Sequence, residues 1–150
     1  MKYLKLLQEW VKEKEWDDEV TYDKEANTSA VNFKVNIKDQ LFSTYIEGDE
    51  TRDWLSIFMY SPFNLKAEKE NDVLKLFNRI HLSTYYGRLV LHEEGVVQYK
   101  QHMPLDGVEP STSLVSNVYS TAIQIYETWL DDIAEIGLTR TTFEEWEANQ

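Results

Sequence analysis

The chain of 150 residues contains no cysteine, three prolines, five glycines and only 15 basic residues. Without cysteine it can form neither a disulfide framework nor a zinc ribbon. Its low proline and glycine content excludes a collagen, and no apolar run is long enough to span a membrane. A domain of this length buries roughly 70% of the surface that its unfolded chain exposes. We therefore expect a hydrophobic core that needs no metal or disulfide.

Acidic residues number 27, so the net charge is −12. The basic residues are scattered, and most have acidic neighbours. Such a charge repels phosphate backbones and anionic lipid at long range, so we expect neither a nucleic-acid partner nor a membrane surface. The acidic surface suits a basic partner or simply keeps the protein in solution.

The first residues, MKYLKLLQEWVKEKEW, do not resemble a secretory signal, because Lys5 and Glu9 interrupt the apolar stretch. Leu4, Leu7 and Trp10 instead recur at helical spacing. We expect a helix over residues 2–15 and a cytoplasmic protein.

The clearest strand pattern lies at residues 31–38, where apolar and polar residues alternate. A short strand is expected before it, at 19–24, and another after it, at 41–47. A turn at Asp39-Gln40 would place Ile37 opposite Phe42, Val35 opposite Thr44 and Phe33 opposite Ile46.

Residues 53–60, DWLSIFMY, form a strand that is apolar on both faces. One row holds Leu55, Ile57 and Met59. The other holds Trp54, Phe58 and Tyr60, with Tyr45 on a neighbouring strand. These four aromatics are either core or an interface, and they are the candidate partner-binding residues. A contact between two copies of this strand would make a homodimer. Pro62 and Asn64 are expected to end the strand.

A helix is expected over residues 66–86, with an apolar stripe that includes Leu74 and His81, stopped by Gly87. A hairpin follows, because Gly95 in the loop Glu93-Glu94-Gly95 supplies the left-handed residue that a three-residue loop needs. This loop aligns Leu89 with Tyr99 and Leu91 with Val97.

The last long helix runs from about Ser111 to Ile136 and ends at Gly137. In the C-terminal extension, residues 138–150, Thr142 and Glu145 form a capping box for a short helix. Phe143 and Trp146 share one face of it and should dock on the protein's own body or on a second chain.

The predicted order is α-β-β-β-β-α-β-β-α-(α) in a single domain, 1–150. Consecutive hairpins imply an α+β fold, with a mostly antiparallel sheet of about five or six strands and helices on one face.

The common catalytic and nucleotide-binding motifs are absent from the chain. His81 fits a packed helix residue with one hydrogen bond, and His92 and His102 fall on different parts of a hairpin. The acidic runs 17–19 and 47–53 lack the ligand spacing of an EF-hand. We expect no catalytic residues, no metal and no cofactor.

The segments VLKLFNRIHLSTYYGRLVLHEEGVVQYKQHMPL and SLVSNVYSTAIQIYETWLDDI resemble the YbjN-like family, described as bacterial sensory transduction regulators. Asn78, Gly87 and Gly95 match the family pattern, whereas His81 replaces a second asparagine that the family often has. The resemblance implies the fold of type III secretion chaperones and carries over no catalytic residue.

The expectation is a non-enzymatic, cytoplasmic protein-binding or regulatory domain that holds a protein segment at a sheet edge or in a groove. The alternative is a small-molecule sensor with a pocket near Asn78 and His81.

Overall fold

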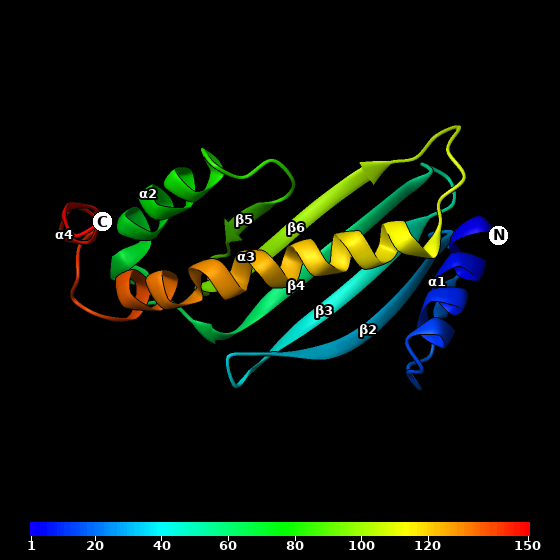
Figure 1. The fold of residues 1–150 in the computed structure, drawn as a ribbon, viewed down its shortest axis with the longest axis horizontal. Helices are drawn as coiled ribbons and strands as arrows, with labels where there is room; N and C mark the ends of the chain where they lie inside the picture. Colours follow the sequence, from blue (N-terminus) through cyan, green and yellow to red (C-terminus); the bar gives the residue numbers. More distant parts are fainter.

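A computed structural model describes residues 1–150 and shows a six-stranded antiparallel sheet in the order β1-β2-β3-β4-β6-β5, with α3 lying along it (Figure 1). The strands are β1 (Thr21–Asp23), β2 (Thr28–Ile37), β3 (Gln40–Asp49), β4 (Trp54–Asn64), β5 (Arg88–Leu91) and β6 (Val96–Pro104). The helices are α1 (Lys2–Glu13), α2 (Glu70–His81), α3 (Thr112–Leu138) and α4 (Phe143–Ala148), with a 3₁₀ turn at Ala67–Lys69. The α+β class and the element order predicted from the sequence are confirmed. None of the helices is both long and apolar enough to cross a membrane.

Helix α3 packs on the middle of the sheet and is hydrogen-bonded to it. The Tyr126 hydroxyl is fully buried and donates a hydrogen bond to the Met59 carbonyl oxygen at 2.8 Å. Burial raises the pKa of this hydroxyl far above its ordinary value, because a phenolate would lose its hydration there. Helices α1 and α3 cover one face of the sheet, called the inner face below. The hydrophobic core has 31 buried residues, and most of those that come from strands lie on this inner face.

Helix α1 docks through aromatic side chains. Trp10 is fully buried and packs against Trp16, Phe33 and Tyr119, with ring centroids 5.2–6.0 Å apart. Tyr3, also buried, replaces the predicted Leu4 on the packed side. It lies against Gly48, where an added Cβ would come within 2.2 Å of Tyr3. The strand therefore needs a residue without a side chain at this point.

The turn between β2 and β3 is one residue earlier than predicted. Lys38 and Asp39 form the two-residue loop, and both have positive φ, as a type I′ turn requires. Ile37 therefore pairs with Gln40, Val35 with Phe42, Phe33 with Thr44 and Val31 with Ile46. The predicted pairs were wrong by two residues, which leaves every side chain on its predicted face.

Strand β4 does not end at Pro62 as predicted. It continues to Asn64, and its register with β6 shifts between Tyr60 and Asn64. Proline cannot donate to a ladder, and such an irregularity is where a strand tolerates it.

The β5–β6 hairpin has the predicted register, with Leu89 opposite Tyr99 and Leu91 opposite Val97. Gly95 has φ +87°, and a Cβ there would lie 2.2 Å from the Leu65 carbonyl oxygen. The glycine is thus required both by the turn and by the chain packed against it.

Helix α2 ends at His81, five residues before the predicted end. The hydroxyls of Ser83 and Thr84 both donate to the Ile80 carbonyl oxygen, at 3.1 and 2.8 Å, and so replace the next turn of the helix. Leu74, assigned to the apolar stripe, is 46% exposed, and Leu76 is buried in its place.

Neither of the two predicted helix-stop glycines has that role. A Cβ at Gly87 would lie 2.5 Å from the Tyr99 ring, so this glycine allows a close approach of the chain to β6. Gly137 lies inside α3, where a Cβ would meet the side chain of Leu65 at 2.5 Å. Both are packing glycines.

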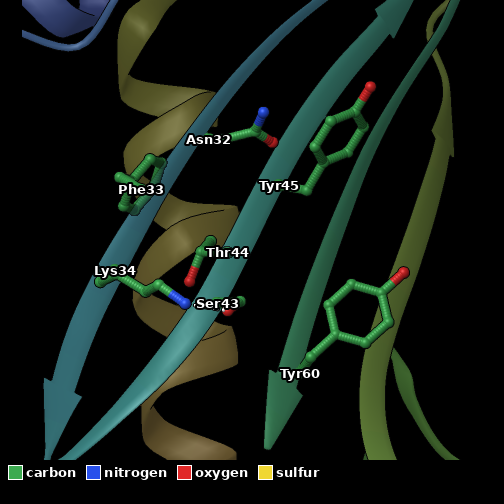
Figure 2. Close-up of a pocket in the computed structure, with 7 residues that line it drawn as sticks. All are labelled: Asn32, Phe33, Lys34, Ser43, Thr44, Tyr45 and Tyr60. Atoms are coloured by element: carbon green, nitrogen blue, oxygen red, sulfur yellow. Dashed lines mark hydrogen bonds between the residues drawn. The ribbon is translucent and has the colours of Figure 1, made fainter. Parts of the chain in front are cut away.

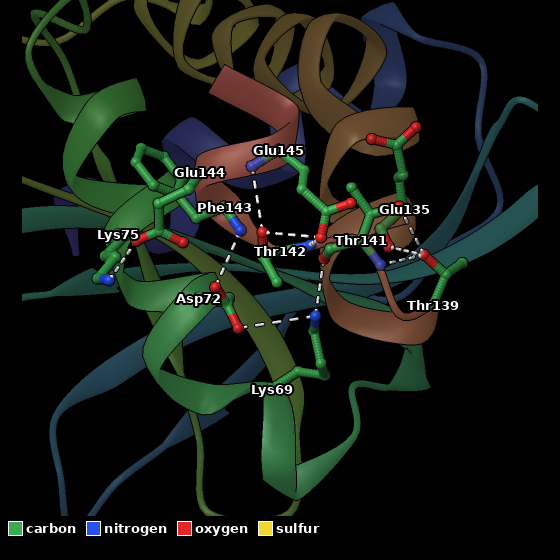
Figure 3. Close-up of polar contacts among 10 residues, drawn as sticks. All are labelled: Lys69, Asp72, Lys75, Glu135, Thr139, Thr141, Thr142, Phe143, Glu144 and Glu145. Carbon is green, nitrogen blue, oxygen red and sulfur yellow. Dashed lines mark hydrogen bonds and ion pairs between the residues drawn. The ribbon is translucent and has the colours of Figure 1, made fainter. Parts of the chain in front are cut away.

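The C-terminal segment docks on the protein's own body, and the capping box of Thr142 and Glu145 is present (Figure 3). Trp146 is 3% exposed, and its Nε1 donates to Asp132 at 2.9 Å. Residues on α2 or next to it supply the remaining polar contacts. Lys69 Nζ donates to the Thr141 carbonyl oxygen, and Asp72 accepts from the Phe143 N–H. Two ion pairs complete the set, Lys75 with Glu144 and Arg79 with Glu147. Of the two alternatives, docking on the body and docking on a second chain, the structure shows the first: Trp146 is buried and Phe143 is partly buried against the core of the same chain.

Candidate functional site

Strand β4 separates its two apolar rows onto opposite faces of the sheet. Leu55, Ile57 and Met59 point to the inner face and are at most 1% exposed. Trp54 is 37% exposed, and Phe58 and Tyr60 are half-buried. They lie on the opposite side, called the outer face below. The helices cover the inner face, so this second row is available to a partner.

The strand register groups the outer-face side chains into rows that cross the sheet. Two adjacent rows, called the middle rows below, comprise Asn32, Tyr45, Phe58, Lys100 and Arg88 in one, and Lys34, Ser43, Tyr60, Gln98 and Val90 in the other. Three of the four candidate partner-binding residues therefore lie together. Trp54 lies toward the N-terminal end of β4, opposite Pro104.

The aromatic side chains of the outer face contact one another. The Tyr45 and Phe58 ring centroids are 6.1 Å apart, and the His102 ring lies 5.5 Å from Phe58 and 6.0 Å from Trp54. The Arg52 guanidinium lies over the Trp54 ring at 5.3 Å. Tyr45, Phe58, His102 and Trp54 thus form a continuous strip of rings, called the aromatic strip below, and Tyr60 lies beside the His92 ring at 6.4 Å.

Hydrogen bonds fix the orientation of these rings. Ser56 Oγ lies 2.6 Å from His102 Nδ1, and Gln98 Nε2 donates to the Tyr60 hydroxyl at 3.0 Å. Gln98 Oε1 also lies 2.9 Å from His92 Nε2. Side chains that are already held in one rotamer lose less entropy when a partner binds.

A shallow hollow of about 590 Å³ lies on the β2–β3–β4 part of the outer face (Figure 2). Tyr45 and Tyr60 form its aromatic side, and Lys34 and Ser43 form its polar side, where Lys34 Nζ donates to Ser43 Oγ at 2.6 Å. This space is large enough for an apolar side chain of a partner.

The charges on the middle rows differ from those of the whole protein. They hold three cations, Lys34, Arg88 and Lys100, and no carboxylate. None of the three is in an ion pair, whereas six pairs form elsewhere. Burial, and then the positive charges of Lys100 and Arg88, lower the pKa of His102, so this ring is neutral at pH 7.

The structure does not bring Asn78 and His81 into one hollow. Asn78 lines a hollow of about 420 Å³ between α2 and α4, together with Leu74, Lys75, Arg79, Leu82, Phe143 and Glu147. His81 instead accepts a hydrogen bond from the Leu89 N–H through Nε2 at 2.9 Å. Burial lowers its pKa, with a smaller contribution from Arg88. His81 is the packed histidine with one hydrogen bond that the sequence favoured.

No three histidine, aspartate or glutamate side chains come together in a way that could hold a metal ion. The acidic run at residues 47–53 has local partners instead. Asp49 accepts from the N–H groups of Thr51 and Arg52, and Asp53 accepts from Lys2 and the Tyr3 hydroxyl.

Sequence reasoning missed the groups that support the aromatic strip. The pairing of Ser56 with His102 and the role of Gln98 depend on the register of β4 with β6, two strands separated by α2 and β5 in the chain. The alternation in each strand could have assigned these residues to a face, but not to one another.

The fold is similar to that of one chain in the solved structure of the HopA1-SchA chaperone-effector complex. The TM-score is 0.54 with 16% sequence identity, and the similarity covers 84% of this chain and 93% of that chain. The chain therefore has an α+β fold that it shares with one chain of this complex. No curated protein sequence matches the chain.

A family model matches residues 3–135, and its description is "Putative bacterial sensory transduction regulator". The match spans most of the chain, so the protein belongs to the YbjN family. The family resemblance inferred from the sequence is confirmed.

Proposed function

We propose that the protein is a non-enzymatic, cytoplasmic binding protein that holds a segment of another protein against the outer face of its sheet. The observation that carries the proposal is the gathering of Tyr45, Phe58 and Tyr60, with Trp54 nearby, on the one sheet face that no helix covers. Aromatic side chains of this kind dominate the binding energy of protein interfaces.

The fold supports the proposal because a chain of similar fold is found in a chaperone-effector complex. The proposed mechanism is passive: rings held by Ser56 and Gln98 cover apolar side chains of the bound segment, and its release needs no chemical step. The end of the family match at residue 135 supports treating 138–150 as an extension of the binding domain.

The homodimer expected from strand 53–60 stays a prediction. A two-fold contact brings the same surface of two copies together. One centred on the middle rows would place Lys34, Arg88 and Lys100 near the same cations of the second copy. The charges of the middle rows favour a different chain as their occupant.

Site-specific photocrosslinking tests the proposal. A photoreactive phenylalanine derivative replaces Phe58 in the full chain in cells of the source organism, and a matched variant carries it at Thr128, an exposed position on α3. We expect the Phe58 position to crosslink a defined protein that mass spectrometry identifies and that binds the purified wild type more tightly than Phe58→Ser. Equal crosslinking at both positions, or equal binding to wild type and Phe58→Ser, would contradict the proposal.

A further inference from the structure

We infer that the outer face selects an acidic segment: apolar side chains of the partner lie on the aromatic strip, and carboxylates on both sides of them pair with the cations of the middle rows. This inference rests on the proposed function and adds the chemistry of the partner.

The first argument is electrostatic. The protein has 27 acidic residues, yet the ten positions of the middle rows contain none and hold three unpaired cations. A cation that a partner covers loses hydration and must regain an opposite charge. The chain supplies no carboxylate in these rows, and Glu47 in the adjacent row interacts with the Tyr45 hydroxyl rather than with one of the three cations. An acidic partner would supply the missing negative charge.

The second argument is the spacing of the cations. Lys34 lies on β2 and Lys100 on β6, with β3 and β4 between them. Strands are about 4.8 Å apart, so the two positions are separated by about 15 Å across the sheet. An extended segment advances about 3.3 Å per residue. Its flanking carboxylates would therefore be about four or five residues apart, with the apolar residues between them.

The third argument is the position of the hollow. Lys34 borders it, while Tyr45 and Tyr60 line its other side. One apolar side chain can enter beside the rings while a neighbouring carboxylate reaches the Lys34 ammonium. Arg88 and Lys100 are directly opposite each other on β5 and β6 and receive the second acidic group.

Two other occupants fit these observations less well. A second copy of the chain would bring cation to cation, as described above. A single-stranded nucleic acid would also find aromatic rings and cations, but it carries a phosphate at every nucleotide, and the protein's net charge of −12 opposes it.

The test uses the full-length protein and fluorescein-labelled peptides in an anisotropy titration. One peptide has two glutamates on each side of Phe-Leu-Phe, a second has lysines in their place, and a third keeps the glutamates around Ser-Gly-Ser. The charge-reversed variant is Lys34→Glu/Lys100→Glu. Its matched control is Lys5→Glu/Lys12→Glu, at two exposed lysines of α1, the helix that packs on the opposite face of the sheet.

We expect the wild type and the control variant to prefer the acidic apolar peptide over both others. The charge-reversed variant should lose affinity for it by roughly tenfold, as the loss of two exposed ion pairs implies, and should gain affinity for the lysine peptide. Added salt should weaken wild-type binding to the acidic apolar peptide.

Each contrary outcome has a defined meaning. If Phe58→Ser abolishes peptide binding while Lys34→Glu/Lys100→Glu binds as the wild type does, the proposed function stands and the acidic preference is wrong. If neither variant changes binding, or if no peptide binds, this inference falls, and the crosslinking result decides the proposed function separately. A uridine decamer that displaces the acidic peptide, or self-association that Phe58→Ser removes, would assign the face to nucleic acid or to a second copy and overturn the inference.

Discussion

The two terminal helices are attached to the same body by different interactions. Helix α1 inserts Tyr3 and Trp10, both fully buried, into the core. Helix α4 buries Trp146, packs Phe143 partly buried against the core, and is further held by polar contacts, among them the exposed pairs Lys75–Glu144 and Arg79–Glu147.

The difference between the two helices coincides with the part of the chain that the family model matches. The match begins at residue 3, at the start of α1, and ends at residue 135, before α4. The helix inside the family region is part of the core, whereas the helix beyond it rests on the surface of α2. Burial of aromatic area stabilises a helix far more than exposed ion pairs do, so the two ends should respond very differently to substitution.

The largest effect is expected for Trp10→Ala. Removing a fully buried tryptophan from contact with Trp16 and Tyr119 should lower the free energy of unfolding by about 3–5 kcal/mol. Urea unfolding followed by circular dichroism measures it, with the exposed Lys12→Ala on the same helix as the control. If Trp10→Ala lowers the free energy of unfolding by less than Lys12→Ala does, the aromatic cluster around Trp10 does not hold α1 on the core.

Truncation after Leu138 should have an intermediate effect. It removes α4, exposes the surface under Trp146, and should cost about 1.5–3 kcal/mol, the burial of one large side chain. Because the docking lies within one chain, the fall in melting temperature should be the same at every protein concentration. A loss that depends on concentration would instead place α4 on a second subunit, and an unchanged melt would mean that α4 contributes nothing.

The double variant Lys75→Ala/Arg79→Ala should cost less than truncation. Exposed pairs contribute about 0.2–1 kcal/mol each, and the variant retains the buried Trp146. Thermal melts at low and high salt check this, because salt should weaken the wild type and leave the variant nearly unchanged. If the variant loses as much stability as the truncated chain, the charges rather than the tryptophan hold α4.

The smallest effect concerns pH. Hydrogen bonding to Lys75 holds the pKa of Glu144 below its ordinary value. A carboxyl whose folded pKa is lowered stabilises the fold above its unfolded pKa and loses that contribution as pH falls through the folded pKa. Glu144→Gln should therefore melt slightly below the wild type at pH 7 and equally at strongly acidic pH. A difference that grows on acidification would contradict this ion pair.

Local turn chemistry decided how much of the fold could be predicted. The β5–β6 register was correct because Gly95 and the alternation of the strands agree. The β2–β3 register was wrong by two residues because Lys38 and Asp39 adopt positive φ, which a lysine does not signal. The end of α2 was missed because Ser83 and Thr84 stop the helix through their hydroxyls, without a glycine or proline nearby.

The sequence predicted which residues of the candidate site share one side of β4, but not whether that side of the sheet is covered by helices. The period of two placed Trp54, Phe58 and Tyr60 on one side of β4, yet both sides are apolar, so the pattern could not say which one the helices cover. That choice depends on distant contacts, such as the Tyr126 hydroxyl at the Met59 carbonyl. The three unpaired cations were also invisible, because five strands have to be in register before they form one group.

The distribution of tryptophans gives the protein an intrinsic optical reporter. Four of the five, Trp10, Trp16, Trp129 and Trp146, are buried or packed partly buried on the core, and Trp54 alone lies on the outer face. Because Trp54 is the most exposed of the five, its indole should emit at longer wavelength than the other four and should be the most accessible to a collisional quencher. A molecule covering this end of the outer face would shift and protect that one component. Occupancy can therefore be followed by fluorescence in the unlabelled protein.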